Sequence, residues 1–183
     1  MFLEGNEVYF RPLSVEDAED FYQWACDREV VKYSLSSFSY PKSKYDLETW
    51  LKNINNDAKT FSLGICVKDS DKLIGYAGIA SISTLNKSGE YFILIGNKSF
   101  WGKGIATETT QIITDYGFNT LGLHRVELTA YNLNPAAYKA YEKAGYVHEG
   151  VKRQSGFRDG KFHDKVMMSA LATEWQSNKQ NIE

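Results

Sequence analysis

Phe100-Trp-Gly-Lys-Gly-Ile-Ala-Thr-Glu108 is the stretch that decides the fold of this 183-residue chain. An apolar run precedes it at residues 90–96, and residues 104–121 carry apolar side chains at helical spacing. Gly102 and Gly104 allow the backbone to turn tightly and to approach a ligand closely. The amides and the dipole at the start of the following helix attract anions such as pyrophosphate. The stretch therefore predicts a phosphate-binding turn between a strand and a helix.

Two familiar nucleotide-binding motifs do not fit this turn. For a P-loop, Gly96 lies one residue too far from Gly102-Lys103, and Gly104 stands where a Ser or Thr is required. For a dinucleotide-binding fingerprint, Thr107 occupies the place of the third glycine. Taken alone, a Gly-Lys-Gly turn also fits an ordinary strand-to-helix loop, so its meaning depends on the rest of the chain.

The remaining segments predict an α/β (α+β) fold. Strands are expected at residues 8–13, 61–67, 73–82, 90–96, 125–130, 146–151 and 162–171. Helices are expected from Ser14 to about residue 26, and over residues 46–55, 104–121 and 135–144. The nearly continuous apolar run at 90–96 is typical of a strand buried on both faces. No linker divides the chain, so residues 1–183 are expected to form one domain, a mixed sheet with helices on both faces.

Composition and charge exclude several classes of protein. With 21 basic and 23 acidic residues, the net charge is −2, and no basic block indicates a nucleic-acid partner. No apolar run is long enough to span a bilayer, and the acidic N-terminal residues lack the features of a signal peptide. Cys26 and Cys66 form no CxxC pair, and the three histidines lack metal-ligand spacing. We therefore expect a cytoplasmic protein that uses no metal.

A second stretch, Asn134-Pro-Ala-Ala-Tyr-Lys-Ala-Tyr-Glu-Lys-Ala-Gly-Tyr146, gives the first its meaning. Together the two resemble the GNAT superfamily of acyl-CoA-dependent acetyltransferases. The first resembles the pyrophosphate loop of that family, Gln/Arg-x-x-Gly-x-Gly/Ala, with Trp101, Gly104 and Ala106 at its defined positions. The second resembles the family's fourth-helix signature, in which an Asn cap is followed seven residues later by Tyr and then by Glu-Lys-x-Gly-aromatic. The resemblance covers residues 7–171 and implies a mostly antiparallel central sheet.

Three sequence features resemble those of the branch that contains ribosomal-protein N-terminal and diamine acetyltransferases. Trp101 replaces the usual Gln or Arg, which removes one side-chain donor from the loop. Leu-His-Arg-Val-Glu at residues 123–127 opens one strand, and Gly-Lys-Phe-His-Asp at residues 160–164 precedes the last. The resemblance implies an amine acceptor: a peptide or ribosomal-protein N-terminus, then a polyamine or other small amine, then an aminoglycoside.

The resemblance also implies an acetyl-CoA site. Main-chain amides would hold the pyrophosphate at Gly102, Lys103, Gly104, Ile105, Ala106 and Thr107. The end of the preceding strand would pair with the pantetheine arm at Leu94, Ile95 and Gly96. Asn134 would hydrogen-bond the same arm, and it is equally a typical helix cap.

Two residues are candidates for the chemistry. Tyr141 matches the family's general acid, because a phenol with a pKa of about 10 is protonated at neutral pH and can protonate the departing sulfur. Its alternative is a core aromatic on the helix face of Ala137 and Ala144. Glu90 matches a general base, often acting through water; its alternative is a strand-edge ion pair with Arg125.

The acceptor side and the assembly are less defined by the sequence. Acidic residues in the N-terminal helices either form a rim that attracts a cationic amine or a solvated helix face: Glu16, Asp17, Glu19, Asp20, Asp27 and Glu29. A homodimer is expected from the resemblance. The alternative function is a non-catalytic acyl-CoA-binding regulatory module, against which the presence of both Tyr141 and Glu90 argues.

Overall fold

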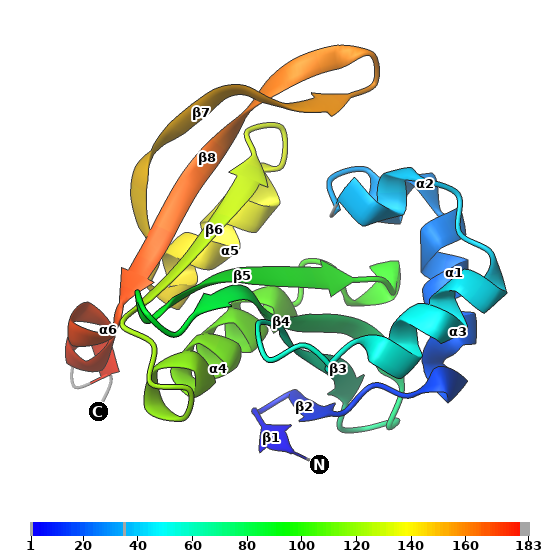
Figure 1. Ribbon diagram of the computed structural model, residues 1–183, viewed down its shortest axis with the longest axis horizontal. Helices are drawn as coiled ribbons and strands as arrows, with labels where there is room; N and C mark the ends of the chain where they lie inside the picture. The colour runs from blue at the N-terminus through cyan, green and yellow to red at the C-terminus, as the bar shows by residue number, and fades with distance from the viewer. Residues whose placement is uncertain (1, 35, 180–183) are drawn as a thin grey trace.

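The computed structural model describes residues 2–34 and 36–179, which build an eight-stranded sheet in the order β1-β2-β3-β4-β5-β6-β8-β7 (Figure 1). The strands are β1 (Leu3–Glu4), β2 (Val8–Arg11), β3 (Phe61–Val67), β4 (Leu73–Ser83), β5 (Ser88–Ile95), β6 (Arg125–Tyr131), β7 (Val147–Arg158) and β8 (Lys161–Leu171). All neighbouring strands of these residues are antiparallel except β5 and β6. The predicted mixed, mostly antiparallel sheet is confirmed.

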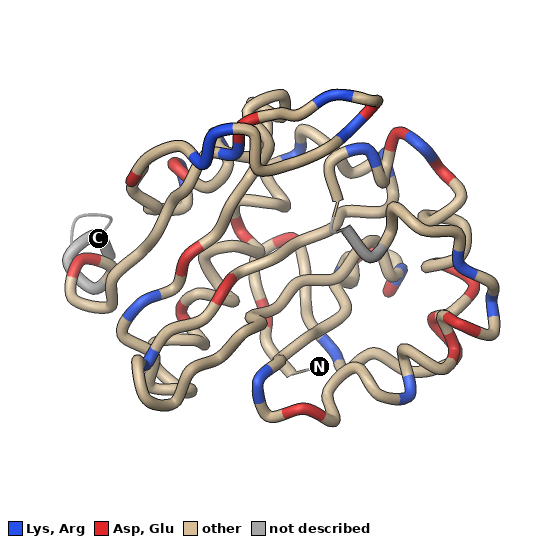
Figure 2. Tube along the Cα trace, turned by 45° about the horizontal axis from the view of Figure 1, so that its top comes forward, with Lys and Arg blue, Asp and Glu red and all other residues tan. Residues whose placement is uncertain are grey.

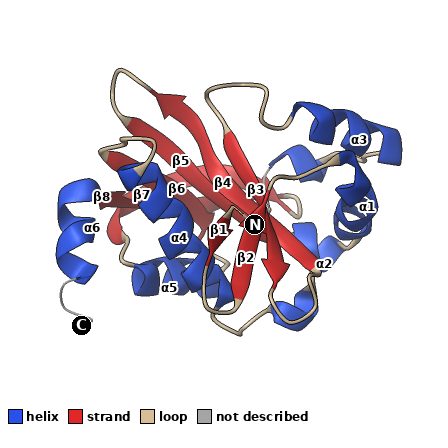
Figure 3. Ribbon diagram, turned by 90° about the horizontal axis from the view of Figure 1, so that it is seen from below, coloured by secondary structure: helices blue, strands red, loops and turns tan. Residues whose placement is uncertain are grey.

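Helices cover both faces of the sheet, as predicted (Figure 3). They are α1 (Ala18–Cys26), α2 (Arg28–Val31), α3 (Lys44–Asn53), α4 (Ile105–Asn119), α5 (Pro135–Ala144) and α6 (Ala172–Lys179). Short 3-10 turns lie at Val15–Asp17, Ser36–Ser39 and Lys98–Phe100. One core cluster joins the sheet to α4, α5 and α6, and a second joins the opposite face to α1, α2 and α3.

Local sequence signals set the helix ends. Ser43 and Asp46 form a capping box at the start of α3, two residues before the predicted start. Asn134 caps α5 by accepting a hydrogen bond from the Ala137 amide at 3.3 Å. Gly145 ends α5 in the left-handed conformation, with φ of 110°.

Several elements lie outside the predicted ones. β1, α2 and α6 were not expected, and β7 extends to residue 158 instead of 151. Most β7 side chains are exposed, so its sequence lacks the apolar alternation by which a strand is recognised. α2 is too short to show a helical period, and it depends on Asp27, whose carboxylate accepts from the amides of Glu29 and Val30. No helix within residues 2–34 and 36–179 is long and apolar enough to cross a membrane.

Candidate active site

β5 and β6 are paired over only a short part of their length. Residues 88–90 lie in parallel register with residues 125–127, and beyond this the two strands diverge (Figure 1). A cavity of about 1220 Å³ opens in the gap, and both strands line it. The edge of residues 91–95 that faces the gap has no partner strand in the described part of the chain. Such an edge can pair with an extended ligand through main-chain hydrogen bonds.

The cavity crosses the sheet from one face to the other. Val126, Leu128 and Ala130 point into the core cluster that contains α4 and α5. Because side chains alternate along a strand, Thr129 and Tyr131 point to the opposite face, toward α1–α3. Both Thr129 and Tyr131 line the cavity. The cavity is therefore lined by residues from both faces of the sheet.

We name the two ends of the cavity by their nearest helix. The α4 half is lined by the loop and first turn of α4, by Asn134 and by Tyr141. The α2 half is lined by Tyr33, Glu90, Thr129, Tyr131, Arg158 and Lys165. Glu90 stands beside Glu127 in the register of β5 and β6, and Lys165 stands opposite Tyr131, so all four share the α2 face.

The loop before α4 is shaped to receive an anion. Gly102 and Gly104 have φ of 73° and 82°, and a Cβ built at either would meet nothing within 4 Å. α4 begins at Gly104 without a side-chain cap, so its first amides have no acceptor from a capping residue. A pyrophosphate fits such amides, which lie at the positive end of the helix dipole.

Most of the predicted loop residues line the cavity. They are Gly102, Gly104, Ile105, Ala106 and Thr107. Lys103 lies outside the lining, with its ammonium 5.0 Å from the centre of the Phe100 ring. Two cations of α5 that line the cavity, Lys139 and Lys143, were not predicted. Their four-residue spacing within the signature helix was the signal that could have identified them.

Two of the three residues predicted at the strand end lie in the cavity wall. Leu94 and Ile95 line the cavity, whereas Gly96 lies outside the lining. Gly96 is buried against the Trp24 ring, and its amide donates to the Ile74 carbonyl at 2.8 Å. The indole N–H of Trp101 donates to the Ile95 carbonyl at 2.8 Å, so this side chain stabilises the loop and does not replace the donor expected to be missing.

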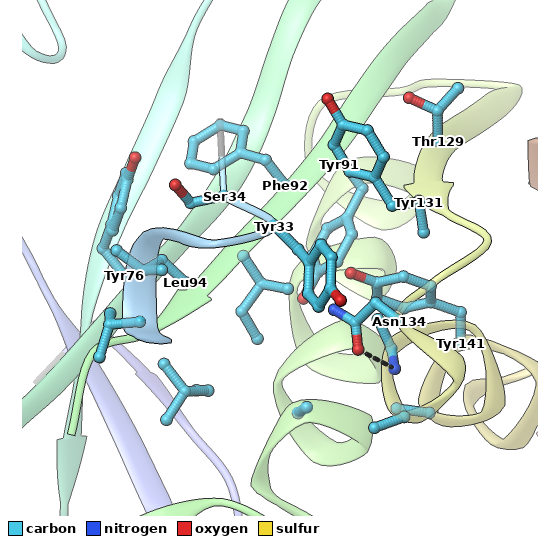
Figure 4. Close-up of a pocket in the computed structure, with 18 of the residues that line it drawn as sticks. Tyr33, Ser34, Tyr76, Tyr91, Phe92, Leu94, Thr129, Tyr131, Asn134 and Tyr141 are labelled. Carbon is cyan, nitrogen blue, oxygen red and sulfur yellow. Dashed lines mark hydrogen bonds between the residues drawn. The ribbon is translucent and has the colours of Figure 1, made fainter. Parts of the chain in front are cut away.

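Asn134 and Tyr141 both reach the cavity from α5 (Figure 4). The cap role of Asn134 is confirmed by its bond to Ala137, and its contact with a ligand stays a prediction. The Tyr141 ring is buried, 6.0 Å from the Tyr91 ring and 6.4 Å from the Tyr146 ring between centroids. Burial raises the pKa of Tyr141 to about 12.

The Tyr141 hydroxyl differs from those of its neighbours. Tyr91 accepts a hydrogen bond from Thr110 at 3.0 Å, and the Tyr146 hydroxyl lies 2.7 Å from that of Thr114. The Tyr141 hydroxyl has no hydrogen-bond partner among the residues that the structure describes. Tyr141 is therefore a core aromatic whose hydroxyl can still bond to a ligand.

Glu90 lies in the cavity wall, but not as the sequence suggested. It is exposed, so the prediction that the strand at residues 90–96 is buried on both faces is wrong at this residue. The reason is that the strands separate just beyond Glu90, which opens its side chain to the cavity. Arg125 pairs instead with Glu127 at 2.8 Å and with Glu149 at 2.6 Å. The predicted ion pair between Glu90 and Arg125 is therefore wrong. The Glu90 carboxylate is free to contact a ligand.

The acidic residues of the N-terminal helices mostly have structural partners. Of the six, Glu29 is the one that lines the cavity. Asp17 pairs with Arg11 at 2.6 Å, and Glu19 pairs with Lys44 at 2.9 Å. The predicted acidic rim is thus reduced to a single carboxylate.

The site so described matches one family of proteins. A model of the Acetyltransferase (GNAT) domain matches residues 7–147. The chain belongs to the GNAT acetyltransferase family. As a member it is an acetyltransferase, and the predicted resemblance to the diamine branch is confirmed by its relatives.

Relatives of this GNAT chain are similar over nearly their whole length. An uncharacterized N-acetyltransferase, p20, of Bacillus licheniformis is 30% identical, with 94% of this chain and 97% of the relative covered. Spermidine N(1)-acetyltransferase of Vibrio cholerae is 28% identical, with 93% and 96% covered. The crystal structure of spermidine N-acetyltransferase from Vibrio cholerae in complex with CoA and spermine superposes with a TM-score of 0.83. It is 26% identical, with 94% and 99% of the chains covered.

Proposed function

We propose that this protein transfers the acetyl group of acetyl-CoA directly to a primary amine, on a small molecule or a protein N-terminus, within a ternary complex. The observation that carries the proposal is a single cavity that crosses the sheet, with an anion-binding loop at one end and a free carboxylate at the other. The structural neighbour solved with CoA and spermine supports a thioester donor and an amine acceptor.

The α4 half has the groups that coenzyme A would require. The amides of residues 102–107 would hold the pyrophosphate, and Lys139 and Lys143 would offset its negative charge. The unpaired edge of β5 would bond to the amides of the pantetheine arm, with Asn134 beside it. When bound, acetyl-CoA supplies an acetyl group activated as a thioester.

Glu90 would prepare the acceptor. A primary amine is protonated at neutral pH, and its nitrogen cannot attack the thioester carbonyl until one proton has left. Glu90 would accept that proton, directly or through a water molecule. Its exposure to the cavity and its lack of an ion pair with Arg125 support this role.

Tyr141 would assist the departure of the thiol. As the new carbon–nitrogen bond forms and the carbon–sulfur bond breaks, the Tyr141 hydroxyl would donate its proton to the sulfur. The proton lost from the nitrogen on amide formation would return to the phenolate through solvent. A pKa of about 12 keeps the hydroxyl protonated at neutral pH, as the step requires.

The experiment is a panel of amines and peptides incubated with the purified protein and acetyl-CoA, with free coenzyme A as the readout. Steady release with at least one amine is expected. If acetyl-CoA binds by calorimetry but no amine stimulates release, the protein is instead the non-catalytic acyl-CoA-binding module.

A further inference from the structure

Two basic side chains approach the Tyr131 ring in the α2 half. The guanidinium carbon of Arg158 lies 5.0 Å from the ring centroid, and the ammonium of Lys165 lies 4.9 Å from it. Both residues line the cavity, and both belong to the β7–β8 hairpin, along which Figure 2 shows several basic segments. Lys165 is fixed opposite Tyr131 by the pairing of β6 and β8. The two cations are therefore built into the cavity wall.

Neither cation forms an ion pair in the part of the chain that the structure describes. Arg158 donates to three backbone carbonyls, those of Phe157 at 2.8 Å, Ser34 at 3.0 Å and Lys32 at 3.3 Å. Within the described residues, neither Arg158 nor Lys165 has a carboxylate within 4.0 Å. A half-buried cation without a counter-charge costs free energy, so this arrangement favours an anion from outside.

The electrostatics around Lys165 agree with this geometry. Burial lowers the pKa of the Lys165 ammonium, and the positive charges of Arg158 and Lys152 lower it further. Glu90 opposes them, but the net direction remains downward. A bound anion would offset both the burial of this ammonium and the repulsion from its basic neighbours.

A polyamine fits this half of the cavity poorly. Spermidine would bring several positive charges toward Arg158 and Lys165, where like charges repel. The lining contains three carboxylates, those of Glu29, Asp57 and Glu90, against five cations, and the carboxylate of Glu29 is engaged by the ammonium of Lys98 at 2.9 Å. An acceptor with one amine and one anionic group matches the charges better.

We propose that the acceptor is a primary amine that also carries a carboxylate, with Lys165 and Arg158 binding the carboxylate while Glu90 receives the amine. The inference rests on the proposed acetyl transfer and names its substrate class. Arg158 is held by three carbonyls and would act as a fixed donor, whereas the ammonium of Lys165 can turn toward the ligand.

Matched pairs of amines test the proposal. 4-Aminobutyrate is compared with butylamine, and glycine with glycinamide, which also imitates a peptide N-terminus; spermidine is the polycationic control. The wild-type protein should have the higher kcat/KM for the carboxylate-bearing member of each pair. Lys165→Met should lower that kcat/KM by about 10-fold or more, since a charged hydrogen bond is lost. The loss with butylamine should be much smaller, because butylamine has no carboxylate for residue 165 to bind.

Two further variants separate specificity from folding. Lys165→Arg should restore part of the preference for the carboxylate, and Lys161→Met should behave as wild type, because Lys161 is exposed on the same strand outside the cavity. A wild-type preference for spermidine, or an equal loss with both members of a pair in Lys165→Met, overturns this inference and leaves the acetyl transfer standing. An absence of transfer to every amine overturns both.

Discussion

At the residue scale, the rings of Tyr91, Tyr141 and Tyr146 pack against one another, and their hydroxyls differ in hydrogen bonding. Those of Tyr91 and Tyr146 are bonded to threonines of α4, at 3.0 Å and 2.7 Å. That of Tyr141 has no such partner in the described part of the chain, although all three rings belong to one core cluster. The sequence could supply the position of Tyr141 through the motif, but not this difference, which depends on which helix residues face each ring.

Tyr141→Phe removes a hydroxyl that makes no hydrogen bond to the described residues, so the melting temperature should change little. Turnover should fall by about 10²-fold or more, or roughly 2.7 kcal/mol of transition-state stabilisation, because the sulfur loses its proton donor. Acetyl-CoA affinity should change far less. The matched control is Tyr146→Phe, which should lower stability by about 1 kcal/mol and keep turnover. Wild-type turnover in Tyr141→Phe would reduce this residue to packing.

The pH dependence of turnover follows from the same hydroxyl. An acid is lost as pH rises through its pKa, and burial raises that of Tyr141 to about 12. The rate should therefore show no Tyr141-dependent decline between about pH 8 and about pH 10, a window that an unperturbed phenol would already enter. A decline in that window that disappears in Tyr141→Phe would mean that the pKa of Tyr141 is not raised, although its hydroxyl would still act as the acid.

Glu90→Gln should lower turnover by about 10²-fold or more with acetyl-CoA affinity nearly unchanged, because the amide cannot accept the ammonium proton. Stability should hold, since Glu90 is exposed and Arg125 is paired elsewhere. Glu149→Gln is the control: it removes carboxylate contacts to Arg125 and Ser169 and should lower stability while preserving the rate. Thermal denaturation and steady-state kinetics are measured on both variants. A loss of stability with an unchanged rate in Glu90→Gln would mean that Glu90 has a structural role.

At the scale of elements, sequence patterns predicted those segments that bury one apolar face. α1, α3, α4 and α5 and the strands β2–β6 were predicted, and each contributes side chains to one of the two cores. The second half of β7 was missed because its exposed residues show no period. α6 was also missed, since its anchoring depends on a distant contact: the Trp175 indole donates to Asp115 at 2.6 Å.

At the start of α4, a substitution of Gly104 tests the assignment of the cofactor loop. Gly104→Asp places a negative charge where the amides would meet pyrophosphate, and acetyl-CoA affinity should fall by about 10-fold or more, or roughly 1.4 kcal/mol. Gly122→Asp is a matched control, because Gly122 also has positive φ and open space at its Cβ, yet lies outside the cavity lining. Calorimetry should show a loss of affinity in Gly104→Asp alone. Equal affinities in the two folded variants would overturn the assignment of the cofactor loop.

At the scale of the whole molecule, the site exists because two neighbouring strands part. The sequence identified the loop, Asn134, Tyr141 and Glu90 separately, and the register of β5 and β6 brings them around one cavity. No local pattern marks the residue at which the strands separate. For the same reason the cations of the β7–β8 hairpin were not linked to the site, since Lys165 reaches it through the pairing of β8 with β6 and Arg158 through the pairing of β7 with β8.

The two halves of the cavity predict the kinetic order of the reaction. The donor would occupy the α4 half and the amine the α2 half, so both can be bound at once and no acetyl-enzyme needs to form. The cysteines agree with this: neither exposed Cys26 nor buried Cys66 lines the cavity. Initial rates at varied concentrations of both substrates should therefore give intersecting double-reciprocal lines.

Intact-mass measurement tests whether an acetyl-enzyme forms. Incubation with acetyl-CoA alone should leave the protein without an acetyl adduct and release almost no coenzyme A. Later addition of the amine should start release without a burst, because transfer requires the nitrogen that attacks the thioester. Parallel lines, together with an adduct that the amine removes, would mean that a side chain carries the acetyl group. The cavity would then work in two separate steps, and the division into a donor half and an acceptor half would no longer explain its shape.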